Sequence, residues 1–474
     1  MGNTPLAWAA KNGHSEVVKL LLGRDDIDSN KPDKEGQTPL MLAAWNGHEE
    51  VVRLLLGRDG IDPNKPDEEG QTPLMLAAEN GHEGVVKILL GRDDIDPNQP
   101  DDAGLTSLML ASFNGSEEIV KILLSRDDID PDRPNNDGRT PPPGAILNEH
   151  EGVMKMLLER DDINPDESDV DGRTPLYWAA RYGNEGAVEM LLRRDDIDPD
   201  TQDGRDKTPL YIAARYGHQR VVEMLLRRDD VEPNTPDDHG RTPLYFAARN
   251  GHEGVVEMLL GRDDIDPNAP DDDGATPLHC AARYGHSGVV EMLLAQDDID
   301  PDKPDNVGQT PLCYAARYGS ERAVNMLLKR NDVDPNKPNN EGQTALLLAV
   351  DIGFERTAKL LLEWDEIDPN KADDKGRTPL LLAAGYGNEE LVKILLERGD
   401  ANPDISDMDG QTPLYRAALH EYEDVVRILL RWDEVNPENP NKCRQTALSL
   451  AIRNGDPYVI ALLQPPTAAT HSSD

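Results

Sequence analysis

Residues 72–104 read TPLMLAAENGHEGVVKILLGRDDIDPNQPDDAG. Thr72 can cap a helix, because its hydroxyl can accept a hydrogen bond from an unpaired amide of the first turn, and Pro73 suits the first helical position. Apolar residues at helical spacing follow, and Gly81 can take the left-handed conformation that ends a helix. A second apolar segment covers residues 85–90, and the remainder is rich in Asp, Pro, Asn and Gly. The stretch therefore predicts a helix, a turn, a second helix and a loop.

The same pattern recurs along the chain at an interval of 34 residues. The threonine that begins each unit stands at positions 4, 38, 72, 106, 140, 174, 208, 242, 276, 310, 344, 378, 412 and 446. We number these fourteen copies repeats one to fourteen. Neither helix of so short a unit can bury its apolar face alone, so neighbouring units must stack and share one core. The sequence predicts an all-α solenoid over residues 1–464, followed by a disordered tail at 465–474.

The repeated motif resembles that of the ankyrin repeat family. The family signature is T-P-L, then A-A, then G-H, then V-V-x-x-L-L, found here as Thr38-Pro39-Leu40, Ala43-Ala44, Gly47-His48 and residues 51–56. The resemblance covers nearly the whole chain, and the acidic loops look like those of ankyrin arrays abundant in filamentous fungi. The chain departs from the family pattern in two ways. Its loop is one residue longer, and the histidine that usually follows T-P-L in the family is present only as His279. The resemblance implies helix-turn-helix units with projecting loops, called fingers, and a concave groove that binds other proteins.

The charge of the chain restricts its partners. It has 91 acidic and 49 basic residues, for a formal net charge of −42. Such a charge repels phosphate backbones and anionic lipid surfaces, which argues against nucleic-acid and membrane partners. None of the three cysteines is spaced as C-x-x-C, no secretory signal is recognisable, and no apolar run approaches the roughly 20 residues of a membrane helix. We expect an intracellular protein, cytoplasmic or nuclear.

No complete motif for catalysis or metal binding is recognisable. The recurring His-Glu pair is not a zinc-protease motif, because Val86 stands four residues after His82. We expect this histidine to fix the turn between the helices. Residues 167–172 imitate half of a calcium loop, but the twelfth position is Trp178, so a solvated finger is favoured over weak cation binding. Polar residues recur with the period and give no nucleophile with an activating base, so we expect a non-enzyme without cofactor or metal.

The two residues before the turn glycine differ between repeats, at a site that the resemblance places in the concave groove. Repeats six to ten carry arginine there, usually followed by tyrosine. We name these residues the Arg/Tyr ladder: Arg181, Tyr182, Arg215, Tyr216, Arg249, Arg283, Tyr284, Arg317 and Tyr318. Arginine and tyrosine often dominate interface energies, so the ladder is predicted to bind an acidic or aromatic-rich segment of a partner. Two alternatives are pairing of the arginines with finger aspartates and a relic of duplication.

The second helix changes charge at the same point of the chain. A basic residue in repeats one to five gives way to glutamate in repeats six to nine. The basic residues are Lys19, Arg53, Lys87, Lys121 and Lys155, and the acidic ones are Glu189, Glu223, Glu257 and Glu291. This position is expected on the convex side, so positive charge moves to the concave side at repeat six.

Repeat five, residues 140–173, departs most from the pattern, because its first helix reads PPPGAIL where repeat six reads PLYWAAR. Prolines push the preceding residues away from helical angles, Gly144 weakens a helix, and Glu149 replaces the turn glycine. We expect the first helix of this degenerate repeat to be shortened or absent. Decay or a hinge is favoured over a dedicated site, and we expect the array to open first around residues 138–153.

These features favour a non-enzymatic scaffold or adaptor that binds protein partners, as a monomer, through its concave groove and fingers. Two alternatives stay open. One is a regulatory cofactor such as a transcription coregulator, and the other is the repeat region of a larger multidomain receptor.

Overall fold

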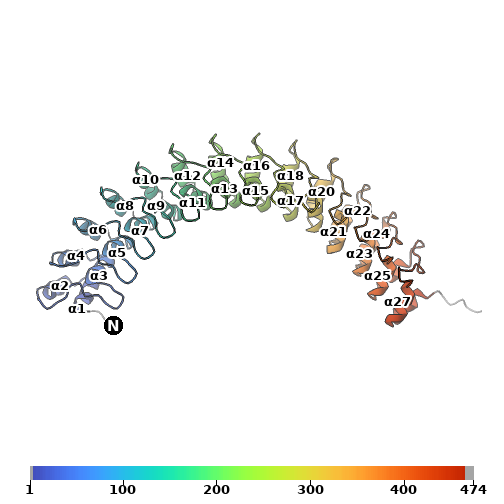
Figure 1. The fold of residues 1–474 in the computed structure, drawn as a ribbon, viewed down its shortest axis with the longest axis horizontal. Coiled ribbons are helices and arrows are strands. Elements are labelled where there is room, and N and C mark those ends of the chain that lie inside the picture. The colour runs from blue at the N-terminus through green and yellow to red at the C-terminus, as the bar shows by residue number, and fades with distance from the viewer. Residues whose placement is uncertain (1–3, 465–474) are drawn as a thin grey trace, which may run out of the picture. The chain divides into compact units, whose positions relative to one another are not determined.

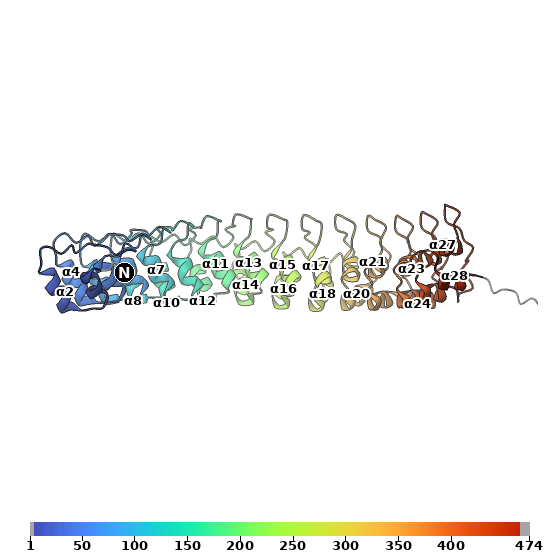
Figure 2. The same cartoon turned by 90° about the horizontal axis from the view of Figure 1, so that it is seen from below.

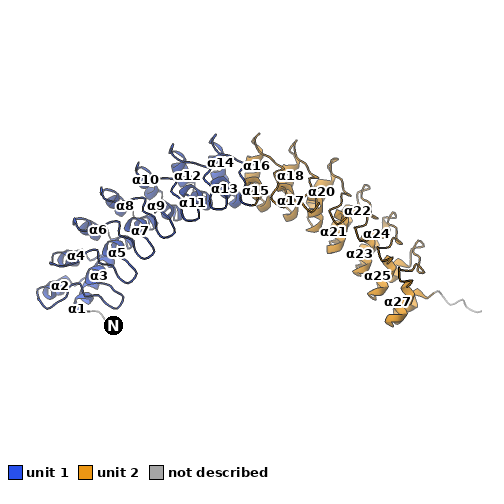
Figure 3. Cartoon of the chain, in the orientation of Figure 1, with its two compact units in different colours: residues 1–238 blue, residues 239–474 orange. Residues whose placement is uncertain are grey.

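The computed structural model describes residues 4–464, and within this range the chain forms 28 helices and no strand (Figure 1). The predicted all-α fold is confirmed. The chain consists of two compact units, Met1–Asp238 and His239–Asp474, which are treated separately below (Figure 3). The predicted disordered tail at 465–474 lies outside the described residues. Within residues 4–464, no helix has the length and apolar character that a membrane crossing needs.

Each unit contains two rows of short helices. The helices of the first unit are α1 (Pro5–Lys11), α2 (Ser15–Leu22), α3 (Pro39–Trp45), α4 (Glu49–Leu56), α5 (Pro73–Glu79), α6 (Glu83–Leu90), α7 (Ser107–Phe113), α8 (Glu117–Leu124), α9 (Pro141–Leu147), α10 (Glu151–Leu158), α11 (Pro175–Tyr182), α12 (Glu185–Leu192), α13 (Pro209–Tyr216) and α14 (Gln219–Leu226). Those of the second unit are α15 (Pro243–Asn250), α16 (Glu253–Leu260), α17 (Pro277–Tyr284), α18 (Ser287–Leu294), α19 (Pro311–Arg317), α20 (Glu321–Leu328), α21 (Ala345–Ile352), α22 (Glu355–Leu362), α23 (Pro379–Gly385), α24 (Glu389–Glu397), α25 (Pro413–Leu419), α26 (Glu423–Leu429), α27 (Ala447–Asn454) and α28 (Pro457–Leu463). In each unit the odd-numbered helices line the inner side of the curve and are called the inner row, and the even-numbered helices form the outer row (Figure 3). The fingers that join successive repeats project to one side of both rows (Figure 2).

The threonine and the small apolar residues of the repeat explain this architecture. Thr106 is extended, and its Oγ1 accepts a hydrogen bond from the amide of Met109 at 3.3 Å, which caps α7. The alanines of the inner row, such as Ala77 and Ala78, are fully buried together with valines and leucines of the outer row. Small side chains let successive inner helices approach closely, so each repeat completes the core of its neighbour.

The recurring histidine joins the turns of adjacent repeats, as expected from its period. Nε2 of His82 lies 2.9 Å from the carbonyl oxygen of Trp45, and Nε2 of His150 lies 3.1 Å from that of Phe113. The turn requires glycine for two reasons: Gly115 has a φ of 69°, which favours glycine, and a Cβ there would lie 2.5 Å from the His150 ring. The histidine therefore has a structural role in the turn.

An arginine at the start of most fingers also ties repeats together, and this role was not predicted from the sequence. Nη1 of Arg126 donates to the carbonyl oxygen of Leu90 at 2.8 Å, at the C-terminal end of α6 in the preceding repeat. Nε and Nη2 of Arg126 donate to the carboxylate of Asp128 at 2.7 and 2.6 Å. A cation at a helix C-terminus interacts favourably with the helix dipole. Arginines with this arrangement are called helix-end arginines, and they include Arg92, Arg126, Arg160, Arg194, Arg228 and Arg330.

A side chain in each finger bonds the next finger. In Asn98, Nδ2 donates to the carbonyl oxygen of Asp128 at 2.7 Å, and Oδ1 accepts from the amide of Asp130 at 2.8 Å. The equivalent residue in repeat four is Asp132, whose Oδ2 accepts from the amide of Asn164 at 2.6 Å. Its Oδ1 is buried without a hydrogen-bond partner, because a carboxylate has no N–H to donate. Asparagine therefore satisfies this position fully and aspartate does not.

The expectation that the first helix of repeat five is shortened or absent is wrong. α9 spans Pro141–Leu147 and has the same length as α7. Its three prolines stand in the first turn, where backbone amides have no partner inside the helix and the φ of proline suits the backbone. The cost is local: Pro143 has no amide to donate, so Oγ1 of Thr140 is buried without a partner. Glu149 takes the left-handed conformation of the missing glycine, with a φ of 58°.

These two local costs give a test of whether residues 138–153 open first. Pro143→Ala supplies an amide for Thr140, and Glu149→Gly removes a strained backbone, so each change should add about 1 kcal/mol of local stability. Amide hydrogen exchange should be faster in wild-type residues 138–153 than in the aligned residues 172–187, and the double variant should remove the difference. Glu421 occupies the equivalent turn position of repeat thirteen and has a φ of 61°, so Glu421→Gly should slow exchange only near itself. Equal protection of the two wild-type segments would contradict the prediction.

Candidate binding surface of the inner row

In the first unit, the ladder residues form a stack of rings and guanidinium groups. The guanidinium carbon of Arg181, on α11, lies 5.8 Å from the ring centre of Trp178 and 5.4 Å from that of Tyr216 on α13. Arg215 lies 6.0 Å from the Tyr216 ring. The Tyr182 ring stacks on Trp178 with 5.8 Å between ring centres. These distances are within the range of cation–π contacts.

In the second unit, the ladder residues of α15, α17 and α19 have the same relation. Arg249 lies 5.5 Å from the Phe246 ring and 5.8 Å from the Tyr284 ring. Arg283 lies 5.5 Å from the Tyr284 ring and 4.6 Å from the Tyr318 ring. An arginine therefore lies over the tyrosine of the following repeat. Arg317, the last arginine of the ladder, is half-buried. Among the described residues of this unit it has no such ring contact.

Four of the five ladder arginines do not pair with finger aspartates, which was one alternative considered from the sequence. Arg181 has no ion pair with a described residue of the first unit. Arg249, Arg283 and Arg317 have none with a described residue of the second unit. The ladder tyrosines keep 42–46% of their surface exposed. The inner row thus presents accessible aromatic rings beside the guanidinium groups of Arg181, Arg249, Arg283 and Arg317, which have no ion pair with described residues of their own unit.

Other large apolar side chains occupy the same position at the end of the inner helices. Those exposed in the first unit are Trp45, Phe113 and Leu147, and those in the second are Ile352 and Tyr386. From the sequence, only the arginines and tyrosines at this position were predicted to bind a partner. Exposed apolar residues gathered on one face are typical of binding surfaces. A comparison of the residues next to the turn in every repeat would have identified them from the sequence.

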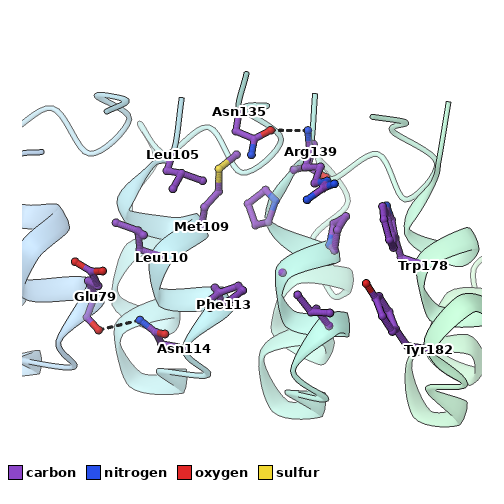
Figure 4. A pocket seen from close by; sticks show the side chains of 15 residues that line it. Glu79, Leu105, Met109, Leu110, Phe113, Asn114, Asn135, Arg139, Trp178 and Tyr182 are labelled. Carbon is purple, nitrogen blue, oxygen red and sulfur yellow. Dashed lines mark hydrogen bonds between the residues drawn. The ribbon is translucent and has the colours of Figure 1, made fainter. Parts of the chain in front are cut away.

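A pocket opens at the degenerate repeat, between α7, α9 and α11 of the first unit (Figure 4). We name it the Gly144 pocket; its volume is about 400 Å³, and its apolar walls include Met109, Leu110, Phe113, Leu147, Trp178 and Tyr182. Gly144 occupies the position that holds Leu110 in the preceding repeat and Trp178 in the following one. A Cβ at Gly144 would lie 3.7 Å from Phe113, an ordinary contact, so the glycine is not required by crowding. The pocket therefore opens at a position where the neighbouring repeats have a large side chain and this repeat has none.

Several buried polar atoms in the wall of this pocket have no hydrogen-bond partner. They are Oγ1 of Thr140, Nε1 of Trp178, Oε2 of Glu79 and Nε of Arg139. Thr140 is 4% exposed and Trp178 is 8% exposed. Burial raises the pKa of Glu79, and the charges of Asp101 and Glu69 add to this effect. Unsatisfied polar groups are rare in proteins, so their concentration in one pocket calls for an explanation.

A second hollow of about 490 Å³ adjoins the pocket and shares Glu79 with it. We name it the acidic hollow; its lining is Glu35, Gln37, Trp45, Asp67, Glu68, Glu69, Gln71 and Glu79. The inner row of the first unit therefore has an acidic region next to an apolar one, before the arginines of the ladder.

The titratable groups that could suggest chemistry elsewhere have structural roles. Nδ1 of His279 accepts from the amide of Thr276 at 3.0 Å, and burial lowers the pKa of its ring. Burial also raises the pKa of Cys280 to about 11, which disfavours a thiolate. In the calcium-like segment, Oδ1 of Asp169 accepts from the amides of Asp171 and Arg173 at 3.1 and 3.0 Å. The carboxylate of Asp169 also pairs with the Arg173 guanidinium at 3.0 Å, so its lone pairs have protein partners.

Comparison with known proteins identifies the repeat. The family model described as "Ankyrin repeats (3 copies)" matches residues 1–67, 60–135, 108–203, 196–271, 263–339, 299–373, 322–407, 346–439 and 399–473. Among solved structures, the chain is similar to the ankyrin repeat domain of Bcl-3, a member of the IkappaB protein family, with 29% sequence identity and a TM-score of 0.43. That similarity covers 48% of this chain and 99% of the other. No curated protein was found to match. Because the family model matches from residue 1 to residue 473, the chain belongs to the ankyrin repeat family, whose fold is a non-catalytic protein–protein interaction module.

Proposed function

We propose that the protein is a non-enzymatic scaffold or adaptor that binds partner proteins through the inner row and the fingers. The observation that carries this proposal is that the guanidinium groups of Arg181, Arg249 and Arg283 lie over aromatic rings and have no ion pair with described residues of their own unit. A guanidinium held against a ring keeps its N–H edge available and loses little conformational freedom on binding. A partner segment with carboxylates or aromatic side chains fits this surface best.

The proposal predicts that the ladder is needed for partner binding. Changing Arg181, Arg215, Arg249, Arg283 and Arg317 to Ala should weaken the binding of a native partner by at least about tenfold, since arginine and tyrosine supply much of the energy at interfaces. The measurement is affinity purification from native extract with mass spectrometry, followed by affinity measurement with the purified partner. Circular dichroism should show unchanged helicity.

The outer row offers a matched control with the same change of charge. Lys19, Arg53, Lys87, Lys121 and Lys155 are exposed on even-numbered helices, and their replacement by alanine should leave the partner bound. Recovery of the same partners with both variants would contradict a role for the ladder. Loss of the partners with both variants would indicate a general charge effect and would also contradict it.

A further inference from the structure

We propose that the Gly144 pocket and the acidic hollow together bind one extended segment of a partner protein. The segment places a large aromatic or aliphatic side chain in the pocket and a lysine or arginine beside Glu79. This inference rests on the proposed use of the inner row, but it assigns a partner chemistry that differs from that of the ladder, on a surface that shares only Tyr182 with it.

The shape of the Gly144 pocket suits a single large apolar side chain. The walls come from three successive inner helices, and the floor lacks a side chain at Gly144. Figure 4 shows Phe113 on one side of the pocket and the rings of Trp178 and Tyr182 on the other. Anchor residues that dominate interface energies fill pockets of this kind, and a buried apolar side chain also displaces poorly bound water.

The unsatisfied atoms indicate that the occupant also brings polar groups. Nε1 of Trp178 can only donate a hydrogen bond, and Oγ1 of Thr140 can donate or accept one. An extended peptide presents backbone carbonyl and amide groups on either side of its anchor residue, and it can satisfy both atoms. In the neighbouring repeats Oγ1 of the equivalent threonine is occupied, as in Thr106 and Thr174. Only in repeat five does proline free this atom at the edge of a pocket.

The charges around Glu79 select a basic residue next to the anchor. Glu79 lies in the wall between the two cavities, and its Oε2 is buried without a partner. Asp67, Glu68 and Glu69 line the acidic hollow beside it. A cationic side chain pairs with Glu79 and relieves the repulsion among these carboxylates. Trp45, which is also exposed in the hollow, offers a ring face to a second cation.

The far side of the pocket fixes the direction of the segment. The guanidinium groups of Arg139 and Arg173 lie 5.0 and 4.6 Å from the Trp178 ring. They already pair with Asp169 and Asp171, so these carboxylates do not offer a second basic residue the unpaired acceptor that Glu79 offers. The basic part of the segment therefore points toward α5 and α3, and the part beyond the anchor toward α11. An acidic segment, which suits the ladder, does not suit the acidic hollow.

The test uses a phage library of random peptides of about 12 residues, the length of a short extended segment. Selection is on the full chain, with counter-selection on Gly144→Leu, which restores the leucine of the preceding repeat and fills the pocket. We expect the enriched peptides to share a large apolar residue with lysine or arginine nearby. A synthetic peptide of the consensus sequence, labelled for fluorescence polarisation, then measures affinity.

We expect Gly144→Leu to weaken the consensus peptide at least about tenfold and Gly144→Ala, which fills little space, less than about threefold. Glu79→Gln should weaken it about three- to tenfold, with a smaller loss at high salt. Glu118→Gln, an exposed glutamate of the outer row, is the matched control and should have no effect. Circular dichroism and thermal unfolding confirm that each variant is folded.

Three outcomes would overturn the inference: no enriched peptide, a consensus without a basic residue, or equal affinity for wild type and Gly144→Leu. A ladder variant that keeps Arg181, with Arg215, Arg249, Arg283 and Arg317 changed to Ala, separates this test from the proposed function, because Arg181 contacts the Trp178 wall of the pocket. It should bind the consensus peptide like wild type. A peptide that is lost with the ladder variant but retained by Gly144→Leu would support the ladder and exclude the pocket.

Discussion

Replacement of Arg126 by alanine should lower the local stability of repeats three and four by about 1.5–3 kcal/mol, the range for hydrogen bonds to charged groups. The side chain is only 23% exposed and joins two repeats. Its loss leaves the carbonyl oxygen of Leu90 without its charged donor at the end of α6. The pair with Asp128 contributes less, because that carboxylate is half-exposed. The effect therefore comes mainly from the contact between repeats.

Amide hydrogen exchange at residues 86–92 and 120–126 should report the loss, since an array of repeats need not unfold in one step. Repeat nine offers the reverse experiment. Gln296 stands where most other repeats have the helix-end arginine, and Asp298 is already in place two residues later. Gln296→Arg should slow exchange at the end of α16 in the second unit. Unchanged exchange in both variants would show that the helix-end arginines do not couple the repeats.

The fold was predictable from the sequence because its determinants are local and repeated. Thr-Pro at the helix start, the alanine pair and the turn glycine each specify a piece of backbone, and their fixed interval leaves stacking as the only way to bury the apolar faces. The helix-end arginines escaped prediction because their acceptor lies 36 residues earlier, as with Arg126 and Leu90. Such a contact depends on the exact distance between stacked repeats.

Repeat five shows a different limit. The prolines were weighed as helix breakers, but residues 141–143 lie in the first turn, where the helix needs no amides. Stacking against α7 and α11 then maintains α9 despite its poor propensity. The pocket itself could have been found by comparing residues 110, 144 and 178, since a glycine between a leucine and a tryptophan removes volume from a packed face. Its unsatisfied polar atoms could not, because they depend on side-chain orientation.

The ladder was predictable only in part: its residues were identified from the sequence, but their contacts were not. The sequence identified arginine and tyrosine at one position of successive repeats, yet offered pairing with finger aspartates as an alternative. The contact between Arg283 and Tyr318 joins residues of adjacent repeats, and its 4.6 Å distance requires the actual stacking geometry.

Asparagine in place of Asp132, Asp166 and Asp200 should stabilise the first unit at neutral pH. Each carboxylate accepts one amide hydrogen bond from the next finger, and each has a buried Oδ1 without a partner. Asparagine supplies the missing N–H, as Asn98 does toward the carbonyl of Asp128. Since the residues are partly exposed, we expect a gain of about 0.5–1 kcal/mol per site, less than a fully buried hydrogen bond would give.

The gain should depend on pH in a defined direction. Burial raises the pKa of the carboxyl groups of Asp132, Asp166 and Asp200 in the folded chain, against the opposing effect of the backbone hydrogen bond. The folded state therefore binds protons more tightly than the unfolded state, so these aspartates favour folding more as pH falls and lose that contribution as pH rises through their folded pKa. The advantage of the triple variant should be largest at neutral pH and should shrink on acidification toward the unfolded pKa of about 4.

Urea unfolding of wild type and variant across this pH range measures the difference, and other carboxylates cancel because both chains share them. Asn98→Asp provides the reverse change at an equivalent finger and should destabilise at neutral pH, with the loss declining in acid. A gain that does not vary with pH would show that the variant acts through something other than the missing donor. A neutral effect of Asn98→Asp would show that the bond between fingers contributes little, whichever residue makes it.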